Sequence, residues 1–157
     1  AMPCNTAHAH ADAIRASGLP FIDMVAETAT EAARGGATRI GVLATPGGDA
    51  LYAAALESLG VEPVRLDTAG RRTFLEAVFQ VKAGDVGEGP QGLMRGLAAG
   101  LVAAGAEVVI GGCTEVPLLI GPDDVAVPLV DSAEVLAAAC VRICLADIAT
   151  DADARQG

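Results

Sequence analysis

The sequence predicts an α/β protein with a parallel sheet, and three observations support this prediction. Short apolar runs rich in β-branched residues alternate with longer segments in which apolar residues recur at helical spacing. Clusters of glycine and proline separate these segments. Hydrophobic residues make up 52% of the 157 residues and aromatic residues only 3%, so the core must be built from Ala, Val, Leu and Ile.

The expected elements follow from apolar spacing and from the glycines that end each segment. Residues 93–104 are a typical expected helix, because Ala and Leu recur at helical spacing and Gly105 closes it. In chain order the pattern predicts helices over residues 5–17, 21–34, 50–59, 71–82, 93–104 and 131–149, and strands over 39–44, 61–66, 106–110 and 125–130.

Three segments carry more specific expectations. Residues 45–49, Thr-Pro-Gly-Gly-Asp, indicate a tight turn between a strand and a helix. Residues 83–92 hold four glycines and a proline, which indicates a flexible connection. Asp131 and Glu134 fit a capping box at the start of the last helix, and the tail from residue 151 is expected to fray.

Composition and charge exclude several classes of function. The formal net charge of −10 argues against nucleic-acid binding, because phosphate contacts need a cationic surface. No run of about eighteen apolar residues occurs, so we expect no membrane span, and residues 1–15 lack the apolar segment of a signal peptide. Four cysteines in a chain of this length do not make a disulfide framework, and we expect a reducing cytoplasm.

Two stretches contain a cysteine followed by small polar residues: Met-Pro-Cys-Asn-Thr-Ala-His over residues 2–8 and Gly-Cys-Thr-Glu-Val-Pro-Leu over residues 112–118. Cys113 follows a β-branched run, which places it at the carboxyl end of a strand, where open α/β sheets bind ligands. Cys4 precedes an expected helix. The sequence leaves no room before Cys4 for a strand, so we expect the chain to be a piece of a longer polypeptide.

Each cysteine therefore stands beside a segment that can begin a helix. Helix-end amides would lower the thiol pKa from about 8.5 towards neutrality and would hold a substrate carboxylate. Two such thiols on either side of a bound carboxylate form a two-base system. One, as thiolate, removes a proton from a carbon, and the other, as thiol, returns a proton to the opposite face.

The cysteines and histidines also have plainer interpretations. A single cysteine is more often a small buried hydrophobe than a catalyst, and core packing is favoured for Cys140 and Cys144 on their apolar helix. Cys4, His8 and His10 suggest zinc, but the usual paired ligand spacing is missing, so we expect no metal site. His8 is assigned to packing or to a supporting contact.

Other candidate residues have structural alternatives too. The turn after Thr45 lacks the dinucleotide fingerprint and the P-loop lysine, so it is either an ordinary turn or the lining of a small-anion pocket. Lys82 lies at a helix end, where a cation is favoured in any case. Asp131 is most simply a helix cap, and Glu115 would cap a helix or orient its neighbours.

Considered together, the motifs make the chain resemble the aspartate/glutamate racemase family, and most closely its aspartate racemase branch. Residues 3–8 resemble the first cysteine motif of that family and residues 112–119 the second, with a separation of 113 − 4 = 109 residues that suits the family. Residues 41–45 and 127–132 resemble the strand that opens the second lobe and the run before the closing helix. Glu115 favours the aspartate branch, because glutamate racemases usually have His there.

The resemblance covers nearly all of residues 2–149 and implies a fold of two Rossmann-like lobes. Their parallel sheets are related by pseudo-twofold symmetry, and the active site lies between them. Residues 1–20 and 131–157 would be the remainder of lobe one, and residues 21–130 would form lobe two. Family members have further residues before the first cysteine motif, so the N-terminal part of lobe one is absent from this sequence.

The resemblance also implies the chemistry. Cys4 and Cys113 would be the acid/base pair of a racemase that uses no cofactor and no metal. Gly48 departs from the family, which commonly has a threonine there. Family members are often homodimers, and the other expected partner is a small amino-acid substrate. The implied substrate-binding residues are Asn5, Thr6, Thr45, Lys82, Thr114 and Glu115.

The expected function is therefore cofactor-independent racemisation of an acidic amino acid, aspartate or glutamate. Hydantoin racemases and maleate isomerases of the same superfamily are alternatives, as are arylmalonate decarboxylases, although these typically lack one of the two cysteines. A truncated, catalytically silent binding module is an alternative of another class.

Overall fold

The structure is a computed structural model in which residues 1–154 are described, with side chains described as far as residue 146. Its centre is a four-stranded sheet in the order β2-β1-β3-β4, and every neighbouring pair of strands is parallel. The α/β class with a parallel sheet is therefore confirmed. The strands are β1 (Arg39–Leu43), β2 (Glu62–Arg65), β3 (Val108–Gly111) and β4 (Leu129–Asp131).

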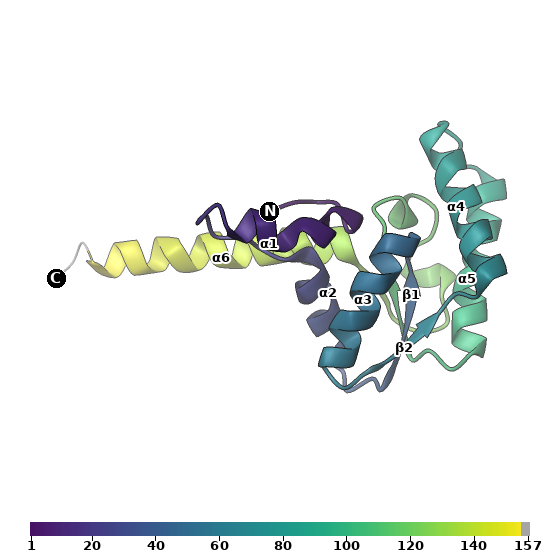
Figure 1. Cartoon of the computed structure of the whole chain (residues 1–157), viewed down its shortest axis with the longest axis horizontal. Coiled ribbons are helices and arrows are strands. Elements are labelled where there is room, and N and C mark those ends of the chain that lie inside the picture. The colour runs from purple at the N-terminus through teal and green to yellow at the C-terminus, as the bar shows by residue number, and fades with distance from the viewer. Residues whose placement is uncertain (155–157) are drawn as a thin grey trace.

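The α-helices are α1 (Ala11–Arg15), α2 (Met24–Ala33), α3 (Pro46–Ser58), α4 (Thr68–Lys82), α5 (Glu88–Ala103) and α6 (Ser132–Ala154), and the 3₁₀ helices are η1 (Thr6–His10), η2 (Val116–Leu118) and η3 (Pro122–Asp124). α2 and α3 cover one face of the sheet, and α4 and α5 cover the other (Figure 1). α6 packs on α2 and then extends away from the sheet. Across the described residues, none of these helices has both the length and the apolar character that a membrane span requires.

Alternate residues of β1 point to the two helical layers. Ile40 and Val42 are buried on the side of α2 and α3, whereas Leu43 is buried on the side of α4 and α5. At Gly41 an added Cβ would come within 3.1 Å of the Leu101 Cβ. Glycine therefore lets α5 lie close to β1.

The tight turn expected over residues 45–49 is wrong, because these residues belong to the start of α3. Thr45 is the N-cap, and its Oγ1 accepts a hydrogen bond from the Gly48 amide at 3.4 Å. Pro46 opens the helix, where its fixed φ is favourable and its missing amide leaves no helical bond unmade. The two glycines that follow indicate a turn only when the cap and the proline are ignored.

Other boundaries also differ from expectation. The flexible connection expected over residues 83–92 is limited to 83–87, because α5 already begins at Glu88. The helix expected over 5–17 is divided into η1 and α1, the strand expected over 125–130 begins only at Leu129, and the last helix continues to Ala154. Asp131 caps that helix as expected, since its Oδ1 accepts a hydrogen bond from the Ala133 amide at 2.8 Å.

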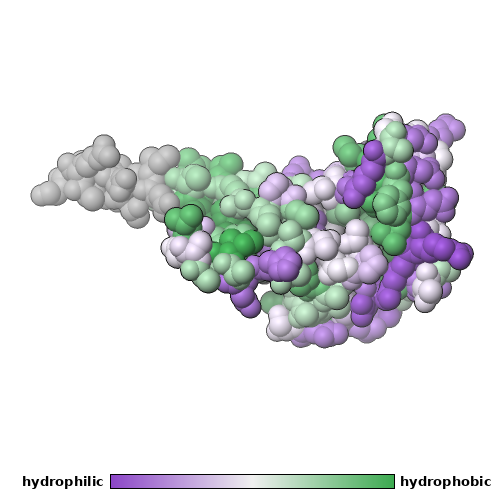
Figure 2. Space-filling view, turned by 45° about the horizontal axis from the view of Figure 1, so that its top comes forward, coloured by the Kyte–Doolittle hydropathy of each residue, from purple (hydrophilic) through white to green (hydrophobic). Residues whose placement is uncertain are grey.

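The outer part of α6 exposes apolar side chains, which form part of the hydrophobic surface in Figure 2. Val141 is 59% exposed and Leu145 is 61% exposed. Cys140 is half-buried, but Cys144 is exposed. Core packing is therefore wrong for Cys144, because α6 extends past the body of the molecule at this point (Figure 1).

Candidate active site

Residues from both cysteine motifs meet at the carboxyl edge of the sheet. The chain runs from β1 outward to β2 and then returns to β3 on the other side of β1, so the strand order reverses between β1 and β3. Open α/β sheets bind ligands at such a reversal. Thr45 follows β1, Cys113 follows β3 after one glycine, and Ser132 follows β4.

A buried chain of hydrogen bonds runs from the first motif to Gly111, the residue just before the second motif. Asn5 is only 4% exposed; its Oδ1 accepts from the Tyr52 hydroxyl at 2.5 Å and its Nδ2 donates to Ser132 Oγ at 3.1 Å. Ser132 donates in turn to the Gly111 carbonyl at 2.8 Å. The residue after Cys4 is thereby fixed to the strand end that leads to the second cysteine.

The first turn of α3 is a second point where the motifs approach each other. The hydroxyl oxygens of Thr6 and Thr45 are 2.8 Å apart and share a hydrogen bond. An added Cβ at Gly47 would lie 2.9 Å from Thr6 Cγ2, and one at Gly48 would lie 3.4 Å from the Gly112 carbonyl oxygen. Glycine at both positions thus allows the N-terminal loop and the loop after β3 to approach α3 closely.

Tyr52 donates to this network from a fully buried position. Burial raises the pKa of its hydroxyl from 10.0 to about 12, so the hydroxyl keeps its proton throughout the neutral range. Sequence analysis did not single out Tyr52 or Ser132. One signal was available: the chain has one tyrosine, and a buried tyrosine hydroxyl normally needs a partner.

The Tyr52 hydroxyl is expected to titrate with a midpoint near 12 in the folded protein and near its ordinary value of 10.0 in urea. Because the chain has one tyrosine and no tryptophan, tyrosinate absorbance reports this group alone. Between these values the unfolded state has lost the proton and the folded state retains it. The free energy of unfolding therefore falls as the pH rises through this window, by up to about 1.4 kcal/mol per pH unit. A folded-state midpoint near 10.0 would contradict the buried network.

Cys113 is held by its own loop. Its Sγ donates to Glu115 Oε2 at 2.9 Å, and Thr114 Oγ1 donates to the same oxygen at 3.3 Å. Lys82, at the end of α4, places its Nζ 3.8 Å from Glu115 Oε1. Glu115 therefore joins a thiol, a hydroxyl and an ammonium group.

The expectation of a lowered thiol pKa is wrong for Cys113. Burial, reinforced by the Glu115 carboxylate that accepts the S–H hydrogen, raises the pKa of this thiol to about 12. The helix-end argument fails because no α-helix begins at Cys113; a turn and the three residues of η2 follow it. Cys113 is thus a thiol at neutral pH.

Cys4 differs from Cys113 in being exposed. Its amide donates to the Met2 carbonyl at 2.9 Å, and its carbonyl oxygen lies 2.9 Å from His8 Nδ1. A 3₁₀ helix follows it, and the Asn5 side chain does not cap that helix. Among the described residues the two thiols share no hydrogen bond with each other. Their loops are connected through the hydrogen bonds that run from Asn5 to Ser132 and on to the Gly111 carbonyl.

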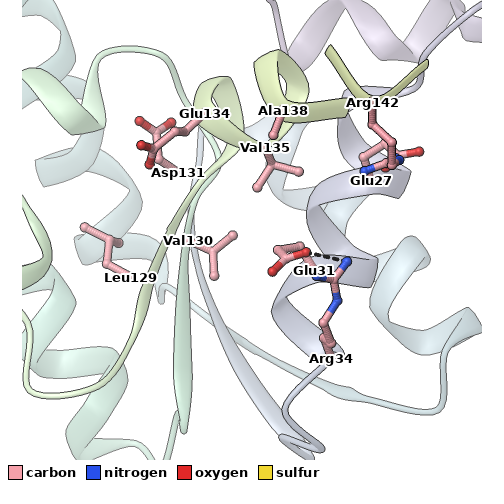
Figure 3. Close-up of a pocket in the computed structure, with 10 residues that line it drawn as sticks. All are labelled: Glu27, Glu31, Arg34, Leu129, Val130, Asp131, Glu134, Val135, Ala138 and Arg142. Carbon is pink, nitrogen blue, oxygen red and sulfur yellow. Dashed lines mark hydrogen bonds and ion pairs between the residues drawn. The ribbon is translucent and has the colours of Figure 1, made fainter. Parts of the chain in front are cut away.

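A cavity of about 400 Å³ lies elsewhere, between α2, β4 and α6 (Figure 3). Charged residues on its wall pair with each other, Glu27 with Arg142 at 2.7 Å and Glu31 with Arg34 at 2.8 Å. Neither cysteine motif contributes a side chain to its wall. The candidate site is therefore the carboxyl edge of the sheet, where the motifs meet.

The fold and these motifs can now be compared with known proteins. The sequence model of the Asp/Glu/Hydantoin racemase family matches residues 1–140. The chain belongs to this family. A Yersinia pestis protein, provisionally described as an Asp/Glu racemase, is similar in structure, with a TM-score of 0.82 and 30% sequence identity; the match covers 90% of this chain and 64% of that one.

Two further solved structures are similar to the chain. An aspartate racemase homologue from Pyrococcus horikoshii has a TM-score of 0.76 and 26% identity, with 89% of this chain and 63% of that chain covered. A glutamate racemase isoform from Bacillus anthracis has a TM-score of 0.62 and 26% identity, with 92% and 56% covered. This racemase family member therefore spans 64% or less of the length of these three relatives.

Proposed function

We propose that this chain carries the acid/base site of a cofactor-independent racemase that acts on aspartate or glutamate. The observation that supports the proposal is the hydrogen-bond chain at the sheet edge that joins Asn5, the residue after Cys4, to Gly111, two residues before Cys113. Cys4 is exposed, whereas Cys113 is a protonated thiol bonded to Glu115 at 2.9 Å. The Asn5 chain links their loops.

The unlike thiols suit a two-base reaction. Cys4, as thiolate, takes the α-proton from one face of the substrate, and the Cα–H bond breaks to leave a carbanion beside the carboxylate. Cys113, as thiol, gives its proton to the opposite face and becomes a thiolate. Glu115, which accepts the S–H hydrogen bond at rest, orients that proton, and Lys82 offsets the charge of the carboxylate.

Substrate binding is proposed for the hydroxyl groups at the edge of the sheet. Thr6 and Thr45, which share a hydrogen bond, and Thr114 would bind the α-carboxylate. Lys82 would bind the side-chain carboxylate beside Glu115. Asn5 already uses its Oδ1 and one Nδ2 bond within the protein, so its contribution is the remaining Nδ2 hydrogen and its amide.

The same proposal includes the division of the chain into two lobes and the assembly of the protein. Residues 1–20 and 131–157 would be the remainder of lobe one and residues 21–130 lobe two, with the substrate between the lobes. The proposed racemase works as a cytoplasmic homodimer without a cofactor or a metal.

Exchange of the α-proton in D₂O tests the proposal. The chain is incubated with both enantiomers of aspartate and glutamate, with hydantoins and with maleate, and deuterium incorporation is followed by NMR. Exchange with inversion of aspartate or glutamate is the expected result. Binding of acidic amino acids without exchange would instead support the alternative of a catalytically silent binding module.

Replacing Glu115 by glutamine is expected to make Cys113 more reactive. The uncharged amide no longer disfavours the thiolate, so the pKa of Cys113 falls from about 12 while burial still keeps it above its ordinary 9.0. At a fixed pH below these values the thiolate fraction rises about tenfold per pKa unit. The rate of alkylation by iodoacetamide rises with it, by a smaller factor, because a less basic thiolate is a weaker nucleophile. Peptide mass spectrometry measures the rate at Cys113, with Glu134→Gln as the matched control. An unchanged alkylation rate would mean that Glu115 does not control the reactivity of the Cys113 thiol.

A further inference from the structure

His8 is buried and both of its ring nitrogens are bonded to backbone atoms. The Met24 amide lies 3.0 Å from Nε2, and the Cys4 carbonyl oxygen lies 2.9 Å from Nδ1. An amide only donates, so Nε2 must carry the lone pair. The proton is therefore on Nδ1, which donates to the Cys4 carbonyl, and the ring is neutral.

A nearby carboxylate does not change this assignment. Asp23 Oδ1 lies 3.9 Å from Nε2, which is beyond hydrogen-bond distance. The same oxygen caps α2 by accepting from the amides of Val25 and Ala26 at 3.0 and 3.1 Å. Both ring nitrogens of His8 are thus engaged by backbone groups.

The two hydrogen bonds of His8 connect a buried element to an exposed one. Met24 is fully buried at the start of a capped helix, and its carbonyl accepts from Thr28 Oγ1 at 2.6 Å. Cys4 is exposed, and its amide bonds only two residues back, to Met2. The His8 bond therefore ties the Cys4 backbone itself to α2, in addition to the bonds by which Asn5 is held.

We propose that His8 is a positioning residue for the Cys4 thiol. The inference rests on the proposed function for its catalytic consequence, because a displaced Cys4 would miss the α-proton. The donor at Nδ1 places the Cys4 carbonyl, and the acceptor at Nε2 fixes the ring to α2. These two roles can be separated, because asparagine and glutamine each reproduce one of the two nitrogen positions.

Paired variants test this inference on the 157-residue chain. The amide nitrogen of asparagine is as many bonds from Cα as Nδ1, so His8→Asn keeps a donor for the Cys4 carbonyl. The amide oxygen of glutamine corresponds to Nε2, so His8→Gln keeps an acceptor for Met24. His8→Gln is expected to lower kcat for α-proton exchange at least about tenfold with little change in KM. His8→Asn is expected to retain kcat within about threefold, although its α2 anchor is weaker. Exposed His10→Gln is the control.

Hydrogen–deuterium exchange of the backbone provides a readout that does not depend on activity. In His8→Gln the amides of residues 5–8 are expected to exchange at least about tenfold faster, with residues 24–28 unchanged. In His8→Asn the pattern is expected to reverse. Loss of kcat in both variants in proportion to a lowered Tm, or faster exchange at 24–28 alone in both, would overturn the positioning role. If the unmodified chain turns over no substrate, the proposed function fails, and the backbone exchange pattern still decides the inference.

Discussion

Replacing Cys113 by serine is expected to abolish racemisation, with a loss of about 10²–10⁴-fold, while one enantiomer still exchanges its α-proton with solvent. In this variant Cys4 can still remove the proton from the face that it addresses and return a deuteron to the same face. Without the thiol on the opposite face, inversion stops. Chiral chromatography measures inversion, and NMR in D₂O measures exchange.

Replacing Cys4 by serine is expected to reduce activity more than replacing Cys113 does. In Cys4→Ser the remaining thiol of the pair is Cys113. Its pKa is raised to about 12, so almost none of it is thiolate at neutral pH. Both inversion and exchange should therefore fall for both enantiomers. Cys140→Ser, on α6 outside the two cysteine motifs, serves as the control and should leave both rates unchanged. Full inversion in either active-site variant would disprove the two-base mechanism.

Replacing Gly112 by alanine is expected to lower the free energy of unfolding by at least about 2 kcal/mol. The added Cβ would lie 2.6 Å from Tyr52 Cε2 and 3.1 Å from the Ala44 Cβ. Tyr52 is fully buried and held by Asn5, so it has no room to move away. Urea unfolding measures the change.

Gly96→Ala is the matched control, because it lies inside α5 and an added Cβ there has no neighbour within 4 Å. Alanine is the better helix former, so this variant should be more stable by up to about 1 kcal/mol. The expected result is a lower free energy of unfolding for Gly112→Ala and a higher one for Gly96→Ala. Equal effects would mean that the space beside Tyr52 adapts to the methyl group.

Local sequence signals predicted the parts of the fold that depend on local contacts. Apolar periodicity located all four strands, and the cap at Asp131 formed as expected because its partner is only two residues away. The start of α3 was mistaken for a turn because Gly47 and Gly48 are poor helix formers. The helix forms because the Thr45 cap and Pro46 start it, and at Gly47 the close approach of Thr6 favours a small residue.

The candidate site was predicted only in part, for the same physical reason. The two cysteine motifs were identified by residue type, but the bonds that join them span long distances in sequence, 47 residues for Tyr52 and Asn5 and 127 for Asn5 and Ser132. The raised pKa of Cys113 depends first on burial, which a single sequence does not specify. The second cause of the raised pKa is Glu115, which lies only two residues after Cys113 in the sequence. This local signal was available in the sequence.

The bond between Asn5 and Ser132 also has a consequence for biosynthesis. A ribosome makes Asn5 127 residues before Ser132, whose hydroxyl accepts its side-chain hydrogen bond. Closing so long a loop requires the intervening sheet to have formed. The bond from Asn5 to Ser132 should therefore form on nascent chains only when translation has passed β4 and the opening turn of α6.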